Sequence, residues 1–182
     1  MNTPCIFVRR ASKFRQSGLT LIETLVALSI FAVVVGGALA LFGSASASQA
    51  TTQLASDLNS LRAATKALYF GQGTYGSNAS LSEVLINAKK VPTTMSITGA
   101  TPNRVINHSL NGQVTVVGNN SQITVKATNI PTEVCIGLAT MTGWDSVQIG
   151  TGAPHSPPVT PSQASTECAA GGVPQAMTFI GS

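Results

Sequence analysis

The feature that most constrains this chain is an apolar run near its start that contains a single charge. From Leu19 to Phe42 the sequence is apolar apart from Thr20, Glu23, Thr24 and Ser29. A helix of this length, at ~1.5 Å per residue, spans about 36 Å and can cross a bilayer. A carboxylate inside a bilayer costs roughly 2.5–3.5 kcal/mol even on the mild insertion scale. Glu23 therefore needs a partner of opposite charge.

A basic segment without acidic residues precedes the apolar run. Its positive residues are Arg9, Arg10, Lys13 and Arg15. Positive residues beside a membrane span stay in the cytoplasm, so we expect the C-terminal part of the chain to lie outside. Cleavage after Gly18 would create a free α-amino group, which is the positive partner that Glu23 lacks. The sequence thus predicts a precursor that is cleaved and then assembled through its new N-terminus.

The stretch Gly18-Leu19-Thr20-Leu21-Ile22-Glu23, between a basic leader and an apolar helix, resembles the class III leader of type IV prepilins and pseudopilins. The resemblance implies cleavage after Gly18 by a membrane-embedded prepilin peptidase and N-methylation of Leu19. It also implies that Glu23 is the glutamate that acts in assembly. The likeness is strong over residues 9–45 and weaker beyond them, where the order of elements and one cysteine pair carry it.

Two other interpretations of the apolar run are an ordinary signal peptide and a plain membrane anchor. A signal peptide is cut after its apolar region at a small-x-small site, and Ala45-Ser46-Ala47 has that form. That interpretation leaves Glu23 within an apolar region that is too long and wrongly charged for a signal peptide. A plain anchor accounts for the length of the run and leaves Glu23 without a role.

Net charge and cysteine usage agree with an extracytoplasmic head. The formal net charge is +4, with ten basic and six acidic residues, and the leader holds four of the basic ones. Without the leader the chain is formally neutral, so net charge gives no case for nucleic-acid binding. Cys5 lies in the leader, whereas Cys135 and Cys168 form an even pair in an oxidising compartment. We expect a disulfide between them, and no metal site, because further ligands at close spacing are lacking.

The apolar run continues into an amphipathic segment without a break. Leucines and one threonine recur at helical spacing, at Leu54, Leu58, Leu61, Thr65 and Leu68. With Gly71 and Gly73 as a stop signal, the pattern predicts one helix over residues 19–70. Gly36-Gly37 interrupts its apolar half and indicates either close helix–helix contact or a point that unwinds in an assembly.

The remaining sequence predicts a head with a short helix followed by strands. Ser80-Leu81-Ser82-Glu83 has the form of a capping box before a short helix. The predicted strands are 104–110, 113–117, 122–127, 133–139 and 177–180, with a long loop over 150–165. The chain is thus predicted to be an α+β protein, with its long N-terminal helix packed on an antiparallel β-sheet head. Cys135 and Cys168 would bound the C-terminal region of that head.

This plan is similar to the pilin fold and implies three parts. They are a leader, 1–18, that is removed; a helix, 19–70, whose residues 19–42 form the transmembrane segment and filament core; and a globular head, 71–182. In its first mature residue, Leu19, and in its long disulfide loop, the chain resembles pilins of the type IVb subclass. Within it, the head resembles the thin-pilus major pilins of conjugative plasmids.

Catalytic and ligand-binding motifs give little support for an enzyme. Gly71-Gln72-Gly73-Thr74-Tyr75-Gly76 matches G-x-G-x-x-G, but it follows a helix rather than a strand. Neither His108 nor His155 has a nearby cysteine or serine motif. Trp144 and Tyr75 fit core packing better than a ligand platform. We expect no enzymatic activity, no cofactor and no metal.

The resemblance implies a structural subunit of a type IV pilus, serving in surface attachment or conjugative mating. Its partners would be other copies of itself, prepilin peptidase, the inner membrane before assembly and the pilus assembly machinery, with no nucleic acid. The precursor would reside in the inner membrane and the product in an extracellular pilus on the cell surface. The alternatives are a type II secretion pseudopilin and a minor pilin or tip adhesin.

Overall fold

The computed structural model describes residues 20–170 and 174–182, and it divides into two compact units after Phe42. Helix α1 (Leu21–Leu68) supplies the described part of the first unit and the start of the second. We call the second unit, Gly43–Ser182, the head. The predicted cleavage junction, Gly18-Leu19, and Cys5 lie outside the described residues.

The part of α1 within the head buries one stripe of side chains, as its sequence pattern predicts. Leu54, Leu58, Leu61 and Thr65 are at most 1% exposed, and Leu68 packs against the same core. The helix ends at Leu68, and Gly71 and Gly73 follow it with positive φ angles of 83° and 69°. Glycine adopts such angles without steric cost, which explains why the chain turns here.

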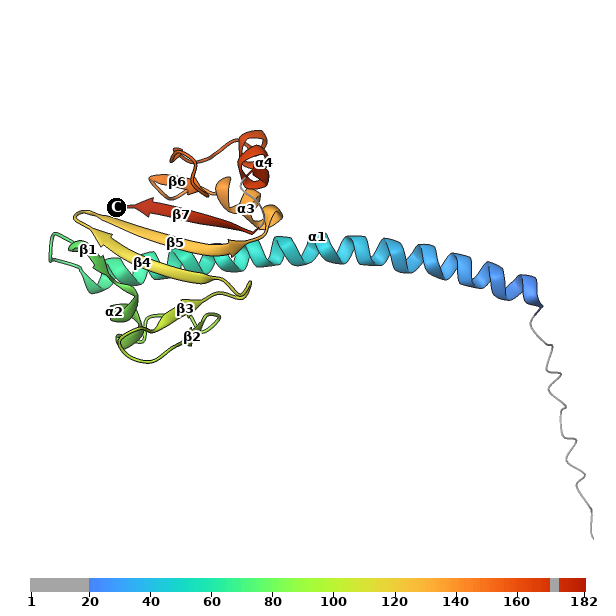
Figure 1. Ribbon diagram of the computed structural model, residues 1–182, viewed down its shortest axis with the longest axis horizontal. Coiled ribbons are helices and arrows are strands. Elements are labelled where there is room, and N and C mark those ends of the chain that lie inside the picture. Colours follow the sequence, from blue (N-terminus) through green and yellow to red (C-terminus); the bar gives the residue numbers. More distant parts are fainter. Residues whose placement is uncertain (1–19, 171–173) are drawn as a thin grey trace, which may run out of the picture. The chain divides into compact units, whose positions relative to one another are not determined.

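The head contains an antiparallel sheet of seven strands within the described residues (Figure 1). The strands are β1 (Ser77–Ser80), β2 (Ser96–Thr98), β3 (Val105–Asn107), β4 (Gln113–Asn119), β5 (Gln122–Ile130), β6 (Ser146–Ile149) and β7 (Gln175–Gly181). Their order is β2-β3-β4-β5-β7-β6. Strand β1 also pairs with β4, near the end of β4 that leads into β5. The sheet confirms the predicted α+β class.

Alternating side chains of the central strands form the core together with α1. Strands β4, β5 and β7 bury every second residue, as a sheet with one covered face requires. The buried residues of these strands include Val114, Val116, Ile123, Val125, Ala127, Met177 and Phe179. They belong to one cluster with Leu54, Leu58 and Leu61 of α1. Burial of this shared surface fixes the second half of α1 against the sheet.

Asparagine-containing turns connect β3 to β4 and β4 to β5. The predicted Asn111-Gly112 signal lies in the first connection, where Asn111 has a φ of 58°. In the second, Asn119 pairs with Gln122, so Asn120 and Ser121 form the turn, and Asn120 has a φ of 54°. Asparagine tolerates this left-handed region better than most residues. Of the predicted strands, 104–110, 113–117, 122–127 and 177–180 correspond to β3, β4, β5 and β7.

The prediction of a strand over 133–139 was wrong. This segment forms helix α3 (Thr132–Ala139), which Pro131 precedes in an extended conformation. Short apolar runs fit a buried helix as well as a buried strand, and here the helix buries Val134, Cys135 and Leu138 on one side. Part of the predicted loop over 150–165 is also helical, because α4 (Pro161–Ala170) begins within it.

The predicted capping box also does not form. Helix α2 (Ser82–Asn87) begins one residue after Leu81, and no side chain caps it. The hydroxyl Oγ of Ser82 instead accepts a hydrogen bond of 2.9 Å from the backbone N–H of Val116, in β4. Glu83 pairs with Arg104 rather than with the helix N-terminus. Tertiary contacts with the sheet have replaced the local cap.

Candidate functional site

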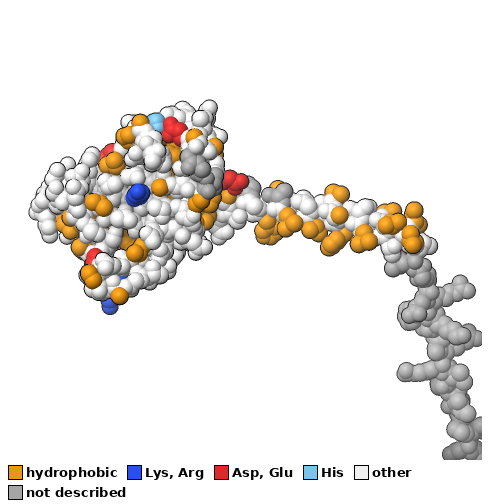
Figure 2. All heavy atoms as spheres, viewed as in Figure 1, with side chains coloured by type: hydrophobic (Ala, Val, Ile, Leu, Met, Phe, Trp, Pro, Cys, Tyr) orange, Lys and Arg blue, Asp and Glu red, His pale blue; other side chains and the backbone are white. Residues whose placement is uncertain are grey.

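The apolar half of α1 exposes almost all of its large hydrophobic side chains. Between Leu21 and Phe42 they are 37% to 78% exposed, and none belongs to the core of the described chain. Figure 2 shows hydrophobic side chains gathered along this part of the helix. Within the described residues, α1 is the one helix long and apolar enough to cross a membrane, judged by length and composition. Such a surface can be covered by lipid or by helices of other molecules.

Glu23 lies in the first turn of α1, at the start of this exposed segment. Its backbone N–H donates a hydrogen bond of 3.0 Å to the carbonyl of Thr20. The N-terminal end of a helix carries partial positive charge, which favours a carboxylate there. In the sequence, Glu23 is also the sole charged residue between Leu19 and Phe42. The geometry therefore presents one carboxylate on an otherwise apolar, uncovered helix.

Gly36 and Gly37 lie in the middle of the same segment. A Cβ atom built on either glycine would meet nothing within 4 Å among the described residues. Packing inside the described chain therefore does not require glycine at these positions. Small residues on an exposed apolar helix allow another helix to approach closely, although this pair also weakens the helix that contains it.

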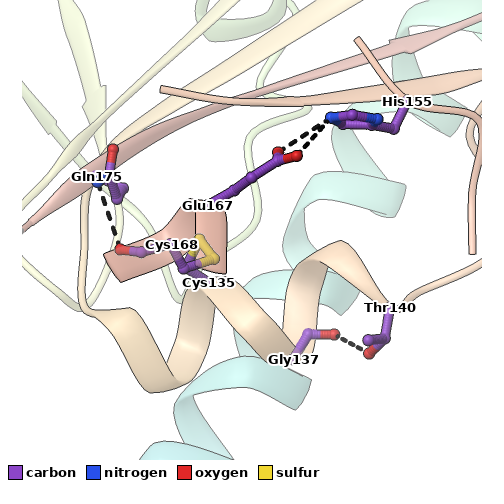
Figure 3. The surroundings of a disulfide bond; sticks show 7 residues. All are labelled: Cys135, Gly137, Thr140, His155, Glu167, Cys168 and Gln175. Atoms are coloured by element: carbon purple, nitrogen blue, oxygen red, sulfur yellow. Dashed lines mark hydrogen bonds and ion pairs between the residues drawn. A yellow bond between two sulfur atoms is a disulfide. The ribbon is translucent and has the colours of Figure 1, made fainter. Parts of the chain in front are cut away.

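A disulfide between Cys135 and Cys168 joins α3 to α4 (Figure 3). The two Cα atoms are 6.0 Å apart, and both side chains are fully buried. The pair was predicted, although the helices that carry it were not. Because the sequence separation is 33 residues, the bond closes a loop that contains β6 and most of the C-terminal region.

A second set of contacts holds the same loop, around His155 (Figure 3). Its ring atom Nε2 lies 2.9 Å from Oε1 of Glu167 in α4, and Gln163 approaches the ring atom Nδ1 at 3.1 Å. The backbone of His155 exchanges hydrogen bonds of 2.8 and 2.9 Å with Val147 of β6. Strand β6 is the last strand of the sheet at this side, so this segment covers its outer edge.

Arg62 of α1 makes a cluster of contacts that the sequence analysis missed. Its guanidinium lies 4.9 Å from the ring centre of Trp144, donates to the carbonyl of Gly143 and donates at 2.9 Å to that of Ser182. Trp144 is 6% exposed and packs against Phe179, which confirms its predicted place in the core. Sequence offered no signal for Arg62, because the residues it contacts are far along the chain.

His108 is buried where β3 leads into β4, rather than in a strand as its neighbours predicted. Its Nε2 lies 2.8 Å from the carbonyl of Thr128, and its Nδ1 accepts from the backbone N–H of Leu110. Burial lowers the pKa of His108, against smaller opposing effects of the Thr128 carbonyl and the Asp57 carboxylate. The Leu110 contact occupies the nitrogen that a second proton would need, which also favours the neutral ring.

Residues 20–170 and 174–182 contain no group of three or more histidine, cysteine, aspartate or glutamate residues that could hold a metal ion. His108 and His155 are each engaged separately, in different parts of the head. The arrangement that stands out is the exposed apolar helix with Glu23, followed by a disulfide-closed head.

Two family models match the sequence. The model described as "Prokaryotic N-terminal methylation motif" matches residues 13–39, and the one described as "PilS N terminal" matches residues 48–181. No curated protein matches the chain significantly.

Two solved pilin structures are similar to this chain. A type IV b pilin from Salmonella typhi is 22% identical, covers 69% of this chain and 95% of its own, and gives a TM-score of 0.57. TcpA, a type IV pilin from the Vibrio cholerae El Tor biotype, is 16% identical. The match covers 74% of this chain and 99% of the TcpA chain, with a TM-score of 0.47. The first likeness shows that the fold of this chain is that of a type IV pilin.

Proposed function

This chain belongs to the PilS N-terminal family of type IV pilins, and from that membership we propose that it is the structural subunit of a pilus on the cell surface. Type IV pilins are structural proteins and not enzymes, so the relevant chemistry is assembly. The proposal goes beyond the family in assigning the surface filament, and a role in attachment or conjugative mating, to this chain.

The observation that carries the proposal is the exposed apolar half of α1 with Glu23 as its one charge. Its apolar surface is stable in lipid, and a bundle of such helices buries it equally well. A carboxylate in either setting needs a positive partner. The α-amino group of a neighbouring copy, created by cleavage, provides one at the matching end of the helix.

The proposed life cycle has two stages. The precursor, with residues 1–18 on the cytoplasmic side, sits in the inner membrane through residues 19–42. Prepilin peptidase then removes the leader and methylates Leu19, and the assembly machinery adds the subunit to a filament of identical copies. The head, which comprises the predicted globular part at residues 71–182 and the second half of the helix, would form the outer surface.

Intact-mass analysis of sheared filaments tests the processing step. We expect a chain that begins at N-methyl-Leu19. Replacing Gly18 with Trp should block processing, because a bulky side chain would stand at the scissile bond, whereas Gly18→Ala adds one methyl group and serves as the control. Filaments that retain residues 1–18, or a chain cut near Ala47, would contradict this proposal.

Electron microscopy of cells with and without the gene tests the surface filament. We expect pili in which this chain is the main component of the sheared fraction. If the chain is processed but supports secretion without surface pili, the pseudopilin alternative holds. If it is present in trace amounts within pili built from another subunit, it is a minor pilin or tip adhesin.

A further inference from the structure

An exposed phenylalanine, Phe70, lies two residues beyond the end of the long helix at Leu68. Phe70 is 90% exposed, about twice the exposed fraction of the head's other exposed large hydrophobic side chains, Val84 at 39% and Ile97 at 45%. Its neighbours Tyr69 and Tyr75 have ring centres 5.7 Å apart and rest against the core. We call Tyr69, Phe70 and Tyr75 the aromatic knob. An aromatic side chain this exposed, beside two others, is typical of an interaction site.

A basic residue accompanies the knob. Lys66 lies one helical turn before Phe70, is exposed, and lines the same hollow in the surface as the knob. In the part of the chain that the structure describes, Lys66 forms no ion pair. The knob therefore presents apolar surface beside an unused positive charge.

A groove of complementary character lies between α1 and α3. We call it the α1/α3 groove, and its lining consists of Ala47, Ser48, Thr51, Thr52, Glu133, Ile136 and Gly137. A Cβ atom on Gly137 would come within 2.6 Å of the Thr51 side chain, so glycine lets α3 approach α1 closely. Glu133 is exposed and, within residues 20–170 and 174–182, forms no ion pair. The groove thus combines small and apolar side chains with an unused negative charge.

The two surfaces lie at opposite ends of the head (Figure 1). Thr51 and Lys66 are both on α1 and, at ~1.5 Å per residue, are about 22 Å apart along its axis. The surfaces share no residue, so one molecule can use both at once. A contact between two different patches of the same molecule joins copies head to tail, and it generates a fibre where the rotation between copies does not close a ring.

We propose that the aromatic knob of one copy docks into the α1/α3 groove of the next copy, with Lys66 facing Glu133. The occupant is a second copy of this chain because the two patches match in apolar character and are opposite in charge. Phe70 is the anchor, and the charged pair at the rim fixes its register. This inference rests on the proposed function, since it assigns a contact between the heads of two neighbouring copies in the proposed filament.

Cysteine cross-linking in assembled filaments tests the contact directly. In the variant Lys66→Cys/Thr52→Cys, the two new thiols of one chain are about 21 Å apart along α1, which is too far for a bond within the chain. We expect oxidised filaments to give ladders of cross-linked subunits on non-reducing gels. The matched control, Lys66→Cys/Ser60→Cys, places the second thiol on an exposed turn of the same helix outside the groove, and it should give few cross-links.

Charge reversal provides a second test that keeps Phe70 intact. Lys66→Glu and Glu133→Lys should each reduce pilus yield by roughly fivefold, because repulsion replaces attraction at a partly exposed interface. The double variant Lys66→Glu/Glu133→Lys should restore most of the yield. Lys126→Glu, which reverses an exposed charge on β5 away from both patches, should change the yield little.

The outcomes separate this inference from the function on which it rests. Pili that form normally, with no more cross-linking at Thr52 than at Ser60, overturn the docking contact and leave the pilus function intact. Failure of the double reversal to recover yield overturns the Lys66–Glu133 pairing. If the unmodified chain forms no pili at all, the proposed function fails and the docking contact fails with it.

Discussion

At the scale of single residues, charge in unusual places has the largest consequences. Glu23 is a lone carboxylate on an exposed apolar helix, whereas Asp57 is a carboxylate buried inside the head. Asp57 accepts hydrogen bonds of 3.1 Å from Gln53 and 2.7 Å from Thr94. These two neutral donors of its own chain satisfy the buried carboxylate of Asp57. Glu23 has no such donors among the described side chains, and in the assembly that we propose its partner is the α-amino group of another copy.

We predict that Glu23→Ala blocks assembly without blocking membrane insertion. The alanine helix should insert at least as well, because the costly charge is gone. Assembly should fail because the α-amino group of a neighbouring Leu19 would be left unpaired, and breaking one side of a buried pair typically costs roughly 3–5 kcal/mol. Immunoblots of membrane and sheared fractions should show processed protein in the membrane and few or no pili.

Thr24→Val is the matched control for that experiment. The Thr24 hydroxyl donates to the carbonyl of Leu21 in its own helix, so its loss removes no charge. This variant should assemble. Normal pili made from Glu23→Ala alone would mean that the proposed pairing with Leu19 has to be abandoned.

The buried imidazole of His108 predicts a loss of stability at mildly acidic pH. The folded pKa is lowered, so between that value and the unfolded value of about 6.5 the unfolded chain binds more protons. The contribution of neutral His108 to the free energy of unfolding should be complete above pH ~6.5. The free energy of unfolding should then fall as the pH drops toward the folded pKa. Urea unfolding of the full chain in detergent, followed by fluorescence of its single tryptophan, Trp144, measures this.

Two glutamine variants assign the pH effect to one histidine. His108→Gln should reduce overall stability, because the Thr128 contact changes, and should flatten the dependence between pH 7.5 and 5.5. His155→Gln should retain that dependence. A steep loss of stability that persists in His108→Gln would show that another group is responsible.

At the scale of secondary-structure elements, sequence was reliable where a pattern repeats over several turns or pairs. The stripe from Leu54 to Leu68 and the alternation of β4 and β5 each involve many residues that agree with one another. The segment 133–139 is too short for such agreement, and its conformation depends on packing with distant partners. Strands β1, β2 and β6 escaped notice for the same reason, because they have only three or four residues each.

We predict that the disulfide contributes substantially to the stability of the head. Cross-linking α3 to α4 removes loop entropy from the unfolded chain, and a loop of this length is worth about 4 kcal/mol in the chain-entropy model. Cys135→Ala/Cys168→Ala should therefore shift the urea midpoint to a lower concentration and increase the slope, because the unlinked unfolded chain is less compact and exposes more surface. Alkylation of non-reduced wild-type protein is the control, because two free thiols there would contradict the disulfide itself.

At the scale of the whole molecule, the two compact units have different requirements for stability. Among the described side chains, none from the apolar segment before Gly43 belongs to the core, whereas the later part of α1 contributes Leu54, Leu58 and Leu61. This difference could be anticipated from sequence, because the apolar run gives way to an amphipathic pattern. The Arg62 cluster with Trp144 could not, since it joins residues that are far apart in the chain.

A truncated chain tests this division. We expect residues 43–182 to fold without the apolar segment and to unfold cooperatively by Trp144 fluorescence. A shorter version, residues 60–182, lacks Leu54 and Leu58 and should be insoluble or unfolded, because losing each large core side chain costs ~2–5 kcal/mol. Equal solubility and cooperativity of the two versions would show that the helix is not part of the core.

The pairing of His155 with β6 protects an edge of the sheet from aggregation during assembly. Pilin subunits would be concentrated side by side, a condition under which exposed strand edges recruit one another into amyloid-like aggregates. One margin of the sheet is occupied by the His155 segment, and at the other margin β2 has three residues. Both margins are poor templates for strand addition. A molecule that we propose polymerises through its helix is thereby kept from polymerising through its sheet.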